Sequence, residues 1–161
     1  MTKKIIIANW KMNPKTYREA EVLAKSISAA AGLGKNLNIV IVPSFVHLHS
    51  VKGVRLGAQN VFWENSGAHT GEVSPLQLKA LGVKYVLVGH SERRALGETN
   101  EEINKKIKAV LSSEMKAVLC VGEKERSKDV VFPKIIQEEL KEGLKSIKKN
   151  FLKNLTIIYE P

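Results

Sequence analysis

Short runs of apolar, mostly β-branched residues recur along the chain, separated by segments with helical periodicity. The runs are continuously apolar, whereas a strand with one solvated face would alternate apolar and polar residues. Continuous runs are typical of parallel strands that are covered on both faces. Six strands are predicted, at residues 4–8, 38–42, 54–59, 85–89, 116–121 and 155–160.

The segments between these runs carry apolar residues three or four positions apart, which predicts amphipathic helices packed on a sheet. Thr99 and Glu102 have the spacing of a capping box, in which hydroxyl and carboxylate each bind a free backbone N–H. Strands that alternate with helices indicate an α/β fold, either an open doubly wound sheet or a closed barrel. The three apolar stripes are Ala20, Leu23, Ala24, Ile27 and Ala31; Ile103, Ile107, Val110 and Leu111; and Ile136, Leu140, Leu144 and Ile147.

Polar residues stand at the carboxyl ends of four predicted strands. An open sheet gathers its ligand contacts mainly at one switch point, whereas a barrel brings every strand end to one mouth. A spread over four strands therefore favours the barrel. The residues are Asn9 and Lys11 after the first strand, Gln59 and Asn60 at the third, His90 after the fourth and Glu160 at the sixth.

These residue types suit acid–base chemistry. The Glu160 carboxylate would take a carbon-bound proton, and the His90 imidazole would polarise or protonate the adjacent oxygen. Lys11 would add a fixed positive charge beside developing negative charge, and Asn9 a neutral donor. Each residue taken singly also suits a structural role, so the prediction depends on their joint placement at strand ends.

A metal site is the alternative use of the histidines in His47-Leu48-His49. A zinc site normally needs three or four Cys, His or carboxylate ligands, and this segment has no nearby Cys or carboxylate. Both histidines are therefore predicted to be ordinary loop residues, with no metal bound.

Composition narrows the protein class. The chain has 161 residues, 43% of them hydrophobic, which excludes a disordered chain and allows a single core. No apolar run approaches the roughly 20 residues that span a bilayer, and no signal peptide is evident. The lone Cys120 excludes an internal disulfide framework, so a cytoplasmic location is expected.

The formal net charge of +10 raises two alternatives, a nucleic-acid surface or attraction of an anionic small molecule. Residues 1–100 hold 13 basic and 6 acidic residues, and residues 101–161 hold 13 and 10, so there is no dense basic tail. With 6% aromatic residues and no stacking motif, a nucleic-acid partner is not expected. A solvated basic surface is the simpler interpretation.

Four motifs, in order along the chain, resemble the triosephosphate isomerase family. They are Asn9-Trp10-Lys11-Met12-Asn13, Gly57-Ala58-Gln59-Asn60, Gly89-His90-Ser91-Glu92-Arg93-Arg94 and Tyr159-Glu160-Pro161. The resemblance covers essentially the whole chain. It implies a (β/α)8 TIM barrel that interconverts dihydroxyacetone phosphate and glyceraldehyde 3-phosphate in glycolysis and gluconeogenesis, without cofactor or metal.

The resemblance also implies roles for single residues. Glu160 would move the proton between adjacent carbons, and His90 would act as a neutral imidazole on the substrate oxygen. Lys11 and Asn9 would bind substrate; Ser91 would hold the glutamate in the open site, and Glu92 would support the lysine. Members are homodimers, so residues 63–74, from Trp63 to Ser74, are expected to enter the partner subunit, with Thr70 approaching its Asn9 and Lys11.

A complete barrel of this type needs eight strands and typically about 250 residues. Six strands are predicted here, so residues 1–161 are expected to be one incomplete TIM-barrel domain, the N-terminal part of a longer chain. Strands seven and eight, the lid and the phosphate-binding loops would be missing. The alternative is that the 161-residue chain is an inactive fragment or one half of a split barrel.

Overall fold

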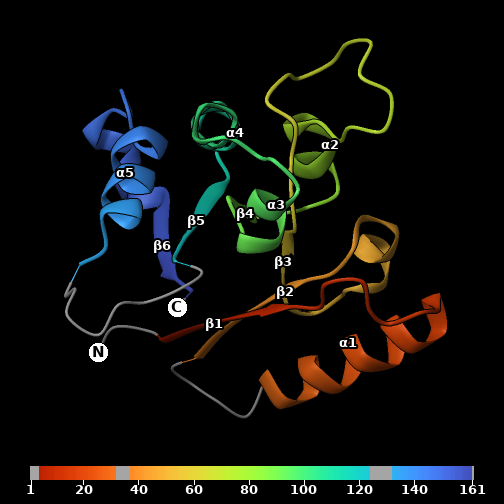
Figure 1. Cartoon of the computed structure of the whole chain (residues 1–161). Coiled ribbons are helices and arrows are strands. Elements are labelled where there is room, and N and C mark those ends of the chain that lie inside the picture. The colour runs from red at the N-terminus through yellow and green to blue at the C-terminus, as the bar shows by residue number, and fades with distance from the viewer. Residues whose placement is uncertain (1–3, 32–36, 124–131, 161) are drawn as a thin grey trace.

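The computed structural model describes residues 4–31, 37–123 and 132–160. Its centre is one sheet of six parallel strands in the order β1-β2-β3-β4-β5-β6 (Figure 1). The strands are β1 (Lys4–Asn9), β2 (Leu37–Val42), β3 (Arg55–Ala58), β4 (Tyr85–Val88), β5 (Lys116–Val121) and β6 (Leu155–Tyr159). All six predicted strands are confirmed, with ends that differ by at most one residue.

The strand order decides between the two predicted architectures. Each strand pairs with the strand before it in the chain, as in the register Ile7↔Val40 and Leu87↔Val118. A doubly wound sheet reverses direction at a switch point, whereas a barrel wall runs in one direction. The predicted incomplete barrel is therefore confirmed. Within the described residues β1 and β6 each pair with one strand only.

Helices connect the strands and lie on the outside of the sheet (Figure 1). Thr99 caps α4 by accepting from the backbone N–H of Glu102, whose carboxylate in turn accepts from the Thr99 N–H, so the predicted capping box is confirmed. The helices are α1 (Tyr17–Ala31), α2 (Pro75–Ala80), α3 (Ser91–Ala95), α4 (Asn100–Ser112) and α5 (Lys134–Gly143), with short 3-10 helices η1 (Phe45–Ser50) and η2 (Lys149–Asn154).

Neighbouring residues of the inner strands face opposite sides of the sheet, and both sides are buried. On β2, Ile41 belongs to the large cluster that includes Ile103 and Ile107 of α4, whereas Val40 and Val42 belong to a second cluster with Leu87 of β4. This two-sided burial explains the continuously apolar runs. The edge strands differ, because Ile6 of β1 and Ile157 of β6 are each 48% exposed.

Two of the three helical stripes need correction. Leu23 is 40% exposed, so the buried face of α1 is narrower than the stripe and consists of Ala20 and Ala24. Helix α5 ends at Gly143, and Ser146 has a left-handed φ of 60°, so Ile147 packs on the core from outside the helix. The α4 stripe is fully buried, as predicted.

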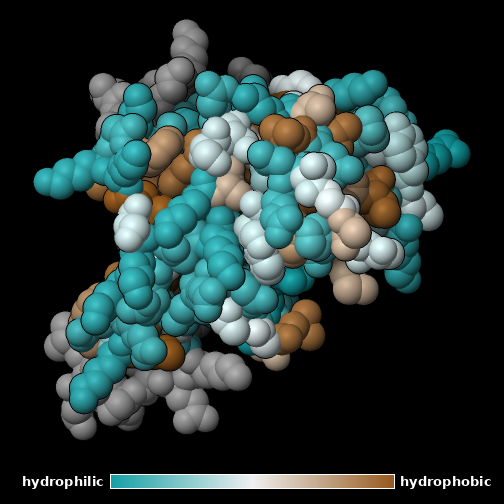
Figure 2. Space-filling model, turned by 90° about the horizontal axis from the view of Figure 1, so that it is seen from above, coloured by the Kyte–Doolittle hydropathy of each residue, from teal (hydrophilic) through white to brown (hydrophobic). Residues whose placement is uncertain are grey.

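Seen from above, the surface is mostly hydrophilic, and its hydrophobic side chains form separate patches (Figure 2). Within the described ranges, none of the helices combines the length and the apolar character needed to span a bilayer.

Candidate active site

Lys11 is held at the end of β1 by contacts from two strands. Its backbone N–H donates to Asn9 Oδ1 at 3.0 Å, and its carbonyl accepts from Gln59 Nε2 at 2.9 Å. The same Gln59 amide donates to Val42 O at 3.1 Å. The φ of Lys11 is 55°, a left-handed conformation that residues with a Cβ rarely adopt, so these bonds fix an unfavourable backbone turn. The turn directs the ammonium toward α3.

The ring of His90 is oriented by the start of α3. His90 is the N-cap residue, and its Nδ1 accepts from the backbone N–H of Glu92 at 3.2 Å. An accepting Nδ1 carries no proton, so this bond assigns the neutral tautomer with the proton on Nε2. The side chain is 12% exposed. His90 therefore presents an N–H donor to the mouth of the barrel.

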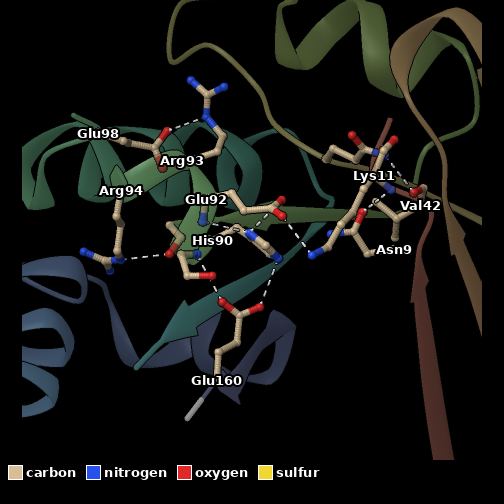
Figure 3. A network of polar contacts seen from close by, with 12 residues as sticks. Asn9, Lys11, Val42, His90, Glu92, Arg93, Arg94, Glu98 and Glu160 are labelled. Carbon is tan, nitrogen blue, oxygen red and sulfur yellow. Dashed lines mark hydrogen bonds and ion pairs between the residues drawn. The ribbon is translucent and has the colours of Figure 1, made fainter. Parts of the chain in front are cut away.

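Glu160 follows β6 and its carboxylate spans the gap to α3 (Figure 3). One oxygen, Oε1, lies 3.2 Å from His90 Nε2, and the other, Oε2, accepts from the backbone N–H of Ser91 at 3.1 Å. The Glu160 backbone N–H donates to Val121 O at 2.8 Å. Both carboxylate oxygens are thus satisfied, and the side chain remains 27% exposed.

An ion pair joins β1 to α3 beside this carboxylate. Lys11 Nζ lies 2.8 Å from Glu92 Oε1, and both side chains are more than half exposed. Their hydrogen bond raises the pKa of Lys11 above its usual 10.5 and lowers the pKa of Glu92 below its usual 4.5. Both groups are therefore charged across the whole neutral range.

This ion pair gives a pH prediction. Because the pKa of Lys11 is raised, the ammonium persists above pH 10.5, and the contribution of the pair is lost as pH rises through the Lys11 pKa. In Glu92→Gln the Lys11 titration should move down toward 10.5, measured by NMR of the labelled lysine. Glu101→Gln, which breaks the comparable Glu101–Lys105 pair, serves as the control. An unchanged Lys11 titration in Glu92→Gln would contradict the assignment.

Cys120 lies behind the carboxylate and is buried. Burial, followed by the charge of Glu160, raises the pKa of this thiol to about 12. A thiol with so high a pKa stays protonated at neutral pH and is a poor nucleophile. Cys120 is therefore not a candidate nucleophile.

The structure brings together six of the residues that the sequence singled out. They are Asn9, Lys11, His90, Ser91, Glu92 and Glu160. Thr70 belongs to the exposed residues 64–72. The loop that contains them leads to α2 and lies apart from the site residues (Figure 1). Asn60 also lies apart, since its Oδ1 accepts from Lys106 Nζ of α4 at 2.9 Å.

His47 and His49 lie in the 3-10 helix η1, so the prediction that they are loop residues is wrong. His47 is buried, and its Nε2 lies 3.0 Å from Pro14 O, so this nitrogen is the donor; His49 is exposed. Among the residues that the structure describes, no group of three His, Cys, Asp or Glu side chains could hold a metal ion.

Two charged residues behind the site were not recognised from the sequence. Arg94 of α3 and Glu139 of α5 form an ion pair at 3.3 Å, close to the strand ends that carry His90 and Glu160. Arg94 belongs to the motif Gly89-His90-Ser91-Glu92-Arg93-Arg94, but the sequence assigned it no role. Glu139 had no sequence signal, since it is one of several glutamates on a charged helix.

Comparison with known proteins gives a consistent result. The family model described as triosephosphate isomerase matches residues 4–161. The chain is 43% identical over 170 residues to the triosephosphate isomerase of Dictyoglomus turgidum, covering 100% of this chain and 68% of that protein. It is 44% identical over 170 residues to that of Leptospira biflexa and 40% over 169 residues to that of Clostridium botulinum, covering 67% of each.

Proposed function

The chain belongs to the triosephosphate isomerase family, and on this premise we propose that it interconverts dihydroxyacetone phosphate and glyceraldehyde 3-phosphate. The observation that carries the proposal is the pairing of a carboxylate, Glu160, with a neutral imidazole, His90, 3.2 Å apart beside the ammonium of Lys11. This set supplies a proton acceptor, a proton donor and a positive charge.

In the proposed mechanism Glu160 removes a proton from the carbon next to the carbonyl, which leaves an enediolate. His90 Nε2–H donates to the oxygen on which charge develops, because its tautomer is fixed by the Glu92 N–H. Lys11 stabilises the negative charge, and Asn9 holds the turn from which Lys11 extends. His90 gives its Nε2 proton to the former carbonyl oxygen and takes up the proton of the neighbouring hydroxyl. Glu160 then returns the carbon-bound proton to the former carbonyl carbon, and the other carbon becomes the carbonyl. These side chains supply every group that the step uses, so the mechanism includes no cofactor or metal.

The contact between the acid and the base is a resting arrangement in this proposal. Glu160 Oε1 and His90 Nε2 lie 3.2 Å apart, so in this proposal they separate when a substrate lies between them. The hydrogen bond from the Ser91 N–H to Glu160 Oε2 holds the carboxylate in this resting position. Contacts of catalytic groups commonly rearrange between the free and the substrate-bound enzyme.

The direct test is turnover of dihydroxyacetone phosphate by the purified protein, with the aldehyde product detected through a coupled dehydrogenase. Conversion without added cofactor for the isomerase step is expected. Absence of conversion by the full-length protein would contradict the proposed function.

We further propose that the protein is a cytoplasmic homodimer of the glycolytic and gluconeogenic pathways, joined through residues 63–74. Residues 64–72 are exposed, yet the loop is held in shape, because the His69 ring lies 4.5 Å from that of Phe62 and its Nε2 lies 3.0 Å from Glu64 Oε2. A preformed protrusion suits insertion into a partner. Thr70→Arg is expected to shift the protein toward monomer in sedimentation velocity, whereas a dimer of unchanged strength would contradict this interface.

The barrel itself is proposed to close with further strands. The chain spans about two thirds of the length of the relatives, 68% for the Dictyoglomus turgidum protein, and β1 and β6 expose Ile6 and Ile157. Residues 1–161 are therefore proposed to form the N-terminal part of an eight-stranded domain, with little activity of their own. The nucleotide sequence after codon 161 tests this: a continuing frame supports it, and a stop codon favours a split barrel.

A further inference from the structure

Arg94, which is partly buried, and Glu139, which is buried, form an ion pair immediately behind the acid–base pair. Arg94 Nη1 lies 3.3 Å from Glu139 Oε1, and their side chains are 17% and 5% exposed. Neither residue contacts His90 or Glu160 through its side chain, and Figure 3 shows the Arg94 side chain extending away from His90. Removing two charges from water costs free energy, so an ion pair in this position is weak evidence for stability and suggests another role.

Glu139 reaches Glu160 through one glycine. Its Oε2 accepts from the backbone N–H of Gly122 at 3.0 Å. Gly122 lies against the Glu160 backbone so closely that a Cβ at this position would lie 1.8 Å from Glu160 O. The backbone position of Gly122 therefore sets that of Glu160, and Glu139 fixes Gly122.

Arg94 reaches the backbone next to His90. Its Nε donates to Gly89 O at 2.8 Å, and its Nη2 donates to Cys120 O at 3.4 Å. Gly89 immediately precedes His90, and Cys120 lies two residues before Gly122. The guanidinium therefore ties the end of β4 to the end of β5.

Among the residues that the structure describes, packing leaves one side of these groups open. A cavity of about 730 Å³ is bordered by Ser91, Arg94, Gly122, Glu139 and Glu160. Beside so large a cavity, van der Waals contacts cannot hold the backbone in place on that side. The directional hydrogen bonds of Arg94 and Glu139 therefore add to the strand pairing of β5 and β6 as constraints on this backbone.

We propose that Arg94 and Glu139 are positioning residues, which set the distance between His90 and Glu160 by tying together the carboxyl ends of β4, β5 and β6. The proposal rests on the isomerase function proposed above. Displacing a catalytic group by about 1 Å can cost about 100-fold in rate. Substrate binding does not depend on this distance, so loss of the pair should lower kcat and leave KM nearly unchanged.

The test compares two replacements of Glu139 in the full-length protein. Glu139→Leu removes the acceptor of the Gly122 N–H and should lower kcat about 30-fold, with KM within about twofold. Glu139→Gln keeps an acceptor oxygen and should restore kcat to within about threefold of wild type. Arg94→Lys keeps the charge but cannot bond Gly89 O and Cys120 O together, and should lower kcat about tenfold even if Glu139→Leu fails to fold.

Asn104→Ala is the matched control. Asn104 is a buried residue whose amide ties α4 to the end of α5, through Gly143 O and Lys145 O at 2.9 Å each, without touching the strand ends. It should lower thermal stability and leave kcat within about twofold. The proposal is overturned if Glu139→Leu loses no more kcat than Asn104→Ala at equal loss of Tm. It is also overturned if Glu139→Gln lowers kcat as much as Glu139→Leu does.

A readout without substrate separates this proposal from the proposed function. The proton on His90 Nε2, an atom that lies 3.2 Å from Glu160 Oε1 in a side chain only 12% exposed, should give a slowly exchanging NMR signal. That signal should disappear in Glu139→Leu and persist in Glu139→Gln and Asn104→Ala. Absence of turnover by the wild-type protein would refute the isomerase function and leave the positioning role untouched. An unchanged His90 NMR signal in Glu139→Leu would refute the positioning role.

Discussion

Replacing Glu160 by aspartate is expected to lower kcat about 100-fold or more while KM changes by less than about threefold. Aspartate keeps the carboxylate and its charge but withdraws its oxygens by about 1.5 Å, the length of one carbon–carbon bond. The bonds to His90 Nε2 at 3.2 Å and to the Ser91 N–H at 3.1 Å cannot then form. The base is present but too far from the carbon that it must deprotonate.

Steady-state kinetics in both directions of the isomerisation measure this effect. Glu142→Asp is the control, because it makes the same change at a residue of α5 that pairs with Lys145 and lies outside the site. It should leave both constants unchanged. Near-normal turnover by Glu160→Asp would remove the role assigned to Glu160.

The second large effect is expected for His90→Gln, a loss of about 100-fold in kcat with little change in KM. Glutamine can still donate a hydrogen bond, but it cannot give up and regain a proton at the substrate oxygen. It also places a flexible amide where the ring is now fixed by the Glu92 N–H. Both the electrostatic and the proton-transfer contributions of the imidazole are lost.

His49→Gln makes the same substitution at an exposed histidine, so it corrects for any general effect of removing an imidazole. Its kinetics should match the wild type. A His90→Gln variant that turns over as fast as His49→Gln would show that the imidazole takes no part in the chemistry.

The fold could be predicted from the sequence wherever burial decides the residue type. Strands covered on both faces must be apolar throughout. The apolar runs that contain Val40 and Val118 could therefore be recognised as buried strands. The barrel could be chosen over an open sheet because polar residues follow several strands, Asn9, His90 and Glu160 among them. The exposure of Ile6 and Ile157 could not be read, since it depends on which strands the sheet includes.

The site was predictable to the same extent and for a related reason. Residues that directly follow strands, such as Lys11 and His90, are placed by chain geometry, so their meeting follows from the fold. Contacts such as that between Arg94 and Glu139 join residues of different helices and depend on tertiary packing, which leaves no local pattern. The left-handed conformation of Lys11 leaves no local pattern either, whereas Gln59, whose amide bonds to the Lys11 carbonyl, directly follows β3 and was singled out from the sequence.

Isomerisation in D₂O followed by NMR tests the central claim most directly. If Glu160 removes a carbon-bound proton and an enediolate forms, part of that proton exchanges with solvent while it resides on the carboxylate. The account predicts that the wild-type protein converts dihydroxyacetone phosphate and that the product carries deuterium at the carbon next to the carbonyl. Conversion without any deuterium at that carbon would indicate direct hydride transfer and would contradict proton abstraction by Glu160.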